Sequence, residues 1–146
     1  MTARKLLGVV LIAMALSAVM TAPTILRPGS VARMDSDDAM HGMWNVAWVA
    51  HALLDSRDRL YDGNIFYPHR STLAYSEANL VAGALATPLY AVTGNPVAAY
   101  NVAIYVALVM AFVATWWVVC RFTGQWIAAL VPAAAFTFSS YVSAHT

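Results

Sequence analysis

Residues 97–120 read VAAYNVAIYVALVMAFVATWWVVC, a run of 24 residues without a charged side chain. Roughly twenty helical residues cross the hydrocarbon core of a bilayer, so this run is long enough for a tilted transmembrane helix. A second uncharged run, residues 6–26, directly follows Arg4 and Lys5. Basic residues beside a span are retained in the cytoplasm, which predicts a cytoplasmic N-terminus.

A cleaved signal peptide is the alternative interpretation of residues 6–26. The run has 21 residues, whereas the apolar region of a signal peptide usually has about 7–15. The best small residue for cleavage, Ala22, is followed by Pro23, which is a poor cleavage context. These features favour an uncleaved helix.

The composition agrees with a membrane protein. Hydrophobic residues make up 61% of the 146 residues and charged residues only 10%, where a soluble domain carries about 25% charged residues. Lipid must therefore solvate part of the surface. The basic residues form no cluster, so nucleic acid is not an expected partner, and the single Cys120 excludes an intramolecular disulfide and a CxxC metal site.

Two shorter apolar runs complete the predicted architecture. The fold class is all-α, a polytopic helical membrane protein with about four transmembrane helices, in one membrane domain of the cytoplasmic (inner) membrane. The predicted spans are residues 6–26, 79–93, 97–120 and 126–142, and an outer loop covers 27–77. A crossing at 79–93 would place Arg121 outside, against the preference of basic residues for the cytoplasm. Asn101, inside the third run, is expected to bond between helices.

The loop of residues 27–77 holds all seven acidic residues of the chain. Asp37 and Asp38 open a stretch of helical composition, where the helix dipole favours negative charge. Trp44 and Trp48 stand four residues apart and therefore share one face of a helix. We predict that residues 37–54 form a helix in the membrane interface, with both indoles toward lipid.

Asp35, Asp37 and Asp38 are the sharpest candidates for chemistry. Carboxylates beside a membrane can bind a divalent cation such as Mg²⁺ or Mn²⁺, or one of them can serve as a general base. His41 lies three residues after Asp38, so both belong to one polar stripe that continues to Asn45. The alternative is an acidic helix start that is solvated and stabilised by the dipole.

Three further polar residues allow two interpretations each. Glu77 directly precedes the second apolar region, so it is either a boundary marker or, with His41, a candidate substrate-binding residue. His51 and His69 lack metal-ligand spacing to another histidine, which favours hydrogen-bonding or interfacial roles.

The order of short motifs resembles the N-terminal part of bacterial membrane proteins of the C-type glycosyltransferase superfamily (GT-C), in the branch with a long first periplasmic loop. The likeness runs from about residue 6 to the end. Its motifs are Asp38 six residues before WNVAWVAHAL (44–53), NIFYPH (64–69), TLAYSE (72–77), PL (88–89), TGNP (93–96), AYN (99–101), RFTG (121–124) and FTFSSY (136–141).

The resemblance implies a glycosyltransferase that uses a polyprenyl-phosphate-linked sugar donor on the outer face of the membrane. By position Asp38, or its neighbour Asp37, matches the acidic residue that acts in such enzymes as a metal ligand or base. The family usually has Gly before that residue and often Pro after it, where this chain has Asp37 and Ala39. Its members also have many more spans, so the chain is expected to be a fragment or split product, inactive without its remaining helices.

Two other classes of function stay open at this point. The chain could be a non-enzymatic membrane protein, such as a transporter piece or an assembly partner, or an inactive truncated remnant. Transporter spans usually bury an ionisable residue near the bilayer midplane, and the apolar runs here contain none. The expected partners are membrane lipid, the lipid-linked donor and the remaining helices of a longer protein.

Overall fold

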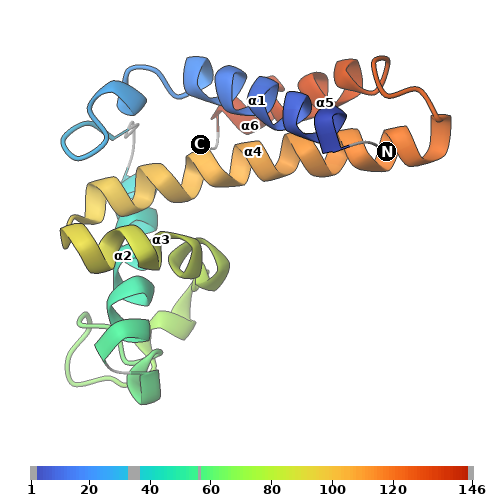
Figure 1. Cartoon of the computed structure of the whole chain (residues 1–146). Helices are drawn as coiled ribbons and strands as arrows, with labels where there is room; N and C mark the ends of the chain where they lie inside the picture. Colours follow the sequence, from blue (N-terminus) through green and yellow to red (C-terminus); the bar gives the residue numbers. More distant parts are fainter. Residues whose placement is uncertain (1–2, 33–36, 56, 145–146) are drawn as a thin grey trace. The chain divides into compact units, whose positions relative to one another are not determined.

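The computed structural model describes residues 3–32, 37–55 and 57–144, with the backbone alone described for 37–39 and 143–144. Within these ranges every regular element is helical (Figure 1), which confirms the all-α class. The α-helices are α1 (Ala3–Met20), α2 (Asp37–Asp55), α3 (Leu80–Thr93), α4 (Pro96–Thr123), α5 (Leu130–Thr137) and α6 (Ser140–Ala144), with short 3₁₀ turns at Thr24–Leu26, Arg57–Arg59 and Thr72–Tyr75. The chain divides into two compact units: unit 1 is Met1–Ala22 with Tyr105–Thr146, and unit 2 is Pro23–Ile104.

Two helices are long and apolar enough to cross a membrane. α1 has 18 residues and α4 has 28, which correspond to about 27 Å and 42 Å of helix. A bilayer core is about 30 Å thick. The predicted run 79–93 corresponds to α3, which has only 14 residues, or about 21 Å. The predicted run 126–142 is not one continuous helix: it begins in a turn and contains α5, of 8 residues, and the start of α6. Membrane association is therefore indicated by α1 and α4, and the four-span architecture stays a prediction.

Unit 1 is built on α1 and the second half of α4, which run antiparallel (Figure 1). At one end the Tyr105 hydroxyl donates to the Met14 carbonyl at 3.0 Å. At the other end Lys5 Nζ lies 5.2 Å from the centre of the Trp126 ring, just after α4. The buried core between these ends consists of Val9, Ala13, Phe112, Trp116, Ala129 and Ala133.

Unit 2 is built on the packing of α2 against α3. Gly83 of α3 lies directly on the Val49 side chain of α2, so closely that a Cβ atom at Gly83 would overlap it. A nearby cluster of buried small side chains, Val46, Ala86, Ala99 and Ala103, continues this packing. The helices can approach this closely because position 83 has no side chain.

Replacement of Gly83 by alanine is expected to lower the melting temperature of unit 2, because α2 and α3 must separate. Overpacking of this kind typically costs about 1–3 kcal/mol. Thermal unfolding in detergent measures the change when it is followed by near-ultraviolet circular dichroism, to which Trp44 and Trp48 of unit 2 contribute together with the three tryptophans of unit 1. The added Cβ would overlap both Cβ and Cγ1 of Val49, so the double variant Val49→Gly/Gly83→Ala, which removes both atoms, should recover part of the loss.

Gly8→Ala is the matched control for Gly83→Ala. Gly8 also lies within a helix, but a Cβ atom there would meet nothing within 4 Å. Since alanine has the higher helix propensity, this variant should keep or raise stability. Equal losses at both glycines would contradict the close packing of α2 on α3.

Asn101 has a different partner from the one expected. Its Nδ2 donates to the carbonyls of Pro28 and Val31, both at 2.7 Å, so it secures the irregular segment after α1 and not a neighbouring helix. Asn95 supports the same segment through a 2.9 Å bond from Nδ2 to the Gly29 carbonyl. The prediction of an interhelical bond was wrong because irregular backbone carbonyls without helix partners are also acceptors for a buried amide.

Candidate functional site

The candidate site lies along the first half of α2, which begins at Asp37 as predicted and ends at Asp55. Asp37 and Asp38 form its first turn, but their side chains lie outside the described residues, as does the whole of Asp35. The backbone places Asp38 one helical turn before His41, on the same face. The residues of the predicted polar stripe therefore lie on one helix.

A segment 35 residues away closes over this part of α2. His41 Nε2 and Ser76 Oγ form a hydrogen bond of 2.9 Å. One turn further along, Asn45 Nδ2 donates to the Glu77 carbonyl, also at 2.9 Å. The structure thus brings His41 and Glu77, the two predicted substrate-binding residues, to the same region of α2, with the Glu77 residue exposed to solvent.

Asn45 differs from the rest of the stripe because it is buried, with 1% of its surface exposed. Its Oδ1 atom is also buried and has no hydrogen-bond partner. A buried, unpaired carbonyl oxygen costs free energy, whereas the Asn45 amide nitrogen holds the Glu77 carbonyl against α2.

Four rings form a ladder along α2: His41, Trp44, Trp48 and His51. The centroid of Trp44 lies 5.7 Å from that of His41 and 6.4 Å from that of Trp48, and both pairs are stacked. His51 continues the ladder at 5.7 Å from Trp48 and contacts Asp55 at 3.2 Å. The shared face predicted for the two tryptophans is confirmed.

The N–H groups of both indoles bond to the protein itself, and the orientation of the rings toward lipid stays a prediction. Trp44 Nε1 donates to Asn64 Oδ1, and Trp48 Nε1 donates to the Leu60 carbonyl, both at 2.9 Å. Both acceptors belong to the loop between α2 and α3, and both indoles are half-buried. Indole N–H groups need an acceptor when covered, and the loop supplies it. The spacing of Trp44 and Trp48 in the sequence predicts that they share a face of the helix, but it does not predict the acceptors of their N–H groups.

The same loop presents aromatic rings to solvent. Phe66 and Tyr75 stack with centroids 6.2 Å apart, and Tyr67 between them in sequence is 97% exposed. Asp62 braces the loop by accepting the Ser71 amide at 2.7 Å. Tyr75 directly precedes Ser76 in the sequence, so the exposed Phe66–Tyr75 pair belongs to the segment that reaches His41.

The described residues do not form a metal site by themselves. No three His, Cys, Asp or Glu residues among them gather closely enough to hold an ion. His41, the nearest described candidate to Asp38, is already bonded to Ser76. A divalent ion would therefore depend on Asp35, Asp37 and Asp38.

No known protein family, curated protein or solved structure matches this chain. The resemblance to GT-C proteins therefore rests on the sequence motifs alone.

Proposed function

We propose that the chain is a multi-pass protein of the cytoplasmic membrane, with its N-terminus inside and the segment between α1 and α4 outside. The antiparallel pairing of α1 with α4 supports this topology. If both helices cross, the end of α4 lies on the same side as the start of α1. Arg4, Lys5 and Arg121 then share the cytoplasmic side, in agreement with the positive-inside rule.

This topology excludes a full crossing by α3. With α1 entering from the cytoplasm and α4 returning to it, the start of α4 is outside, and so is the end of α3. The predicted span at 79–93 is then an outer or interfacial helix, which suits its length and its packing on α2. The orientation conflict at Arg121 disappears.

Cysteine labelling tests the topology in a Cys120→Ser background. We expect Tyr67→Cys and Val92→Cys to react with an impermeant maleimide in intact cells, and Phe122→Cys to react only after permeabilisation. All three positions are exposed, at 97%, 85% and 87%. Labelling of Val92→Cys only after permeabilisation, with outer labelling of Phe122→Cys, would instead establish a crossing by α3.

For activity, we propose that the chain supplies the outer donor-binding part of a GT-C-like glycosyltransferase that uses a polyprenyl-phosphate-linked sugar. The observation that carries the proposal is the closure of Ser76–Glu77 onto His41, next to the turn that holds Asp37 and Asp38. Asn45, Ser76 and Glu77, which belong to two motifs of the resemblance, thereby come together with His41 at the first half of α2. In this site His41 and Ser76 would bind polar groups of the donor, Glu77 would bind a sugar hydroxyl, and the exposed rings would lie against the lipid surface.

Donor binding tests this function directly. The chain in lipid nanodiscs should bind a radiolabelled polyprenyl-phosphate sugar, assayed with Mg²⁺ and with EDTA. Loss of a hydrogen bond to a charged group costs about 1.5–3 kcal/mol, so His41→Ala should weaken binding roughly tenfold or more. His51→Ala is the matched control, because His51 lies on the same helix but pairs with Asp55. Absence of saturable binding, or equal losses in both variants, would contradict the proposal.

A further inference from the structure

Unit 1 carries three basic side chains and no acidic one. Its basic residues are Arg4, Lys5 and Arg121, whereas all seven acidic residues lie between positions 35 and 77, which belong to unit 2. Arg4, Lys5 and Arg121 are all exposed. No carboxylate side chain within unit 1 can therefore neutralise them.

The antiparallel helices bring these charges to one end of unit 1. Arg4 and Lys5 lie in the first turn of α1, and Arg121 lies in the last turn of α4. Lys5 lies over the Trp126 ring, and the buried Trp116 indole donates to the Trp126 carbonyl at 2.8 Å, which ties this connection to α4. The result is a positively charged end beside two apolar helices.

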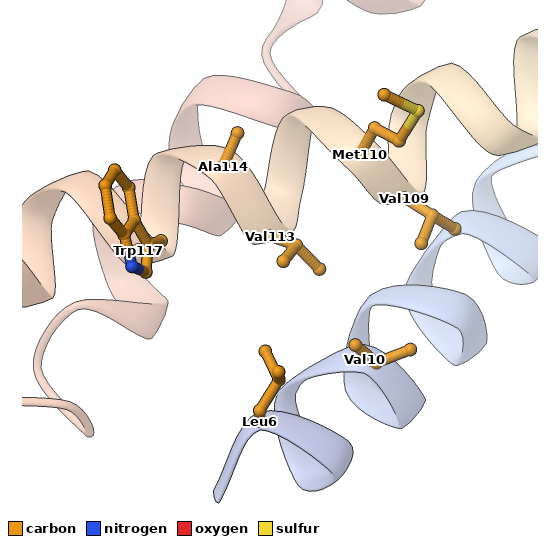
Figure 2. Close-up of a pocket in the computed structure, with 7 residues that line it drawn as sticks. All are labelled: Leu6, Val10, Val109, Met110, Val113, Ala114 and Trp117. Atoms are coloured by element: carbon orange, nitrogen blue, oxygen red, sulfur yellow. The ribbon is translucent and has the colours of Figure 1, made fainter. Parts of the chain in front are cut away.

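An apolar groove between α1 and α4 begins at this end (Figure 2). Leu6 and Val10 of α1 form one wall, and a face of α4 from Val109 to Trp117 forms the other. The groove is open along one side, has a volume of about 570 Å³, and its walls are almost entirely apolar. Trp117 lies one helical turn before Arg121 on the same face of α4, so the groove leads toward Arg121. Arg4 and Lys5 lie in the first turn of α1, at the same end as Leu6.

We propose that this groove binds one acyl chain of an anionic phospholipid whose phosphate contacts Arg4, Lys5 and Arg121. The walls match a hydrocarbon chain, and the exposed Trp117 indole suits the boundary between chain and head group. Anionic lipids of the cytoplasmic leaflet are attracted to each nearby Lys or Arg. A second copy packed through this end of unit 1 would instead bring like charges together.

Electron spin resonance of spin-labelled lipids tests the site in reconstituted vesicles of phosphatidylcholine. The natural chain should immobilise labelled phosphatidylglycerol in preference to labelled phosphatidylcholine, by about fivefold for each basic residue that contacts the phosphate. The triple variant Arg4→Gln/Lys5→Gln/Arg121→Gln should lower the ratio to about one. Ala114→Trp, which fills the groove and keeps the charges, should reduce the immobilised fraction of both lipids.

The variant Arg57→Gln/Arg59→Gln/Arg70→Gln is the matched control, since it removes three exposed arginines from unit 2. It should keep the preference for phosphatidylglycerol. The inference would be overturned if both lipids were immobilised equally, or if the preference were lost with the unit 2 arginines. It would also be overturned if cross-linking showed that a second copy of the chain covers the groove. The inference rests on membrane insertion: a chain that fails to float with vesicles contradicts the proposed topology, whereas a floating chain without lipid preference contradicts this site alone.

Discussion

Trp116→Ala is expected to lower the free energy of unfolding of unit 1 by about 3 kcal/mol. Trp116 is fully buried between α1, α4 and the start of α5, beside Phe112 and Ala133. Truncation of a buried Trp or Phe in soluble proteins costs about 3–5 kcal/mol. We expect the lower end here because lipid also solvates apolar side chains in the unassembled state.

Trp117→Ala is the matched control for this prediction. Trp117 is the next residue on the same helix, but 53% of its surface is exposed, so its loss removes few packing contacts. Trp116→Phe keeps one six-membered ring but removes the pyrrole part of the indole, and with it the bond from Nε1 to the Trp126 carbonyl. Hydrogen bonds within membranes contribute about 0.6 kcal/mol on average, so Trp116→Phe should have the intermediate effect.

Reversible unfolding in mixed micelles, followed by far-ultraviolet circular dichroism, ranks the three variants. We expect Trp116→Ala to be least stable, then Trp116→Phe, then Trp117→Ala close to the natural chain. If Trp117→Ala lost as much stability as Trp116→Ala, the buried core of unit 1 would be wrongly assigned.

Helix positions could be predicted from the sequence because their signals are local: a run of apolar residues, or acidic residues in the first turn, where the helix dipole favours negative charge. Residues 97–120 correspond to α4, and the predicted interfacial helix at 37–54 corresponds to α2 almost to the residue. The side of the membrane for each helix depends on which helices pair, and pairing is not local. The antiparallel contact of α1 with α4 depends on small side chains such as Ala13. Composition alone does not predict which helix such a side chain will pack against.

The candidate site was predictable only in part, for the same reason. Spacing put Asp38, His41 and Asn45 on one face, because a helix repeats every 3.6 residues. Ser76 as the partner of His41, and Asn64 as the acceptor for Trp44, come from a loop whose path no periodicity defines. Gly83 carried no sequence signal for its role, since a glycine in a helical run is equally consistent with open space, as at Gly8.

Asp38→Asn is the change with the largest expected effect on activity, if the proposed glycosyl transfer takes place. Asp38 lies in the first turn of α2, one turn before His41. Because the donor phosphate is anionic, it repels a carboxylate that carries no metal ion. Such a carboxylate is therefore better suited to act on the acceptor hydroxyl than on the donor. Asp38 would take the proton of the acceptor hydroxyl as that oxygen bonds to the anomeric carbon, while the bond from this carbon to the phosphate oxygen breaks and the lipid phosphate leaves. Loss of a general base typically costs about 10²–10⁴ in rate.

Transfer from a radiolabelled polyprenyl-phosphate sugar, measured in vesicles that also contain any further helices the activity requires, checks this prediction. Asp38→Asn should reduce the rate by about two to four orders of magnitude, while flotation with the vesicles stays unchanged. Asp35→Asn, which precedes the helix, should have a much smaller effect. If Asp37→Asn abolished transfer and Asp38→Asn left the rate unchanged, the catalytic role would belong to Asp37. Full activity in both variants would mean that these carboxylates only stabilise the start of α2 through its dipole.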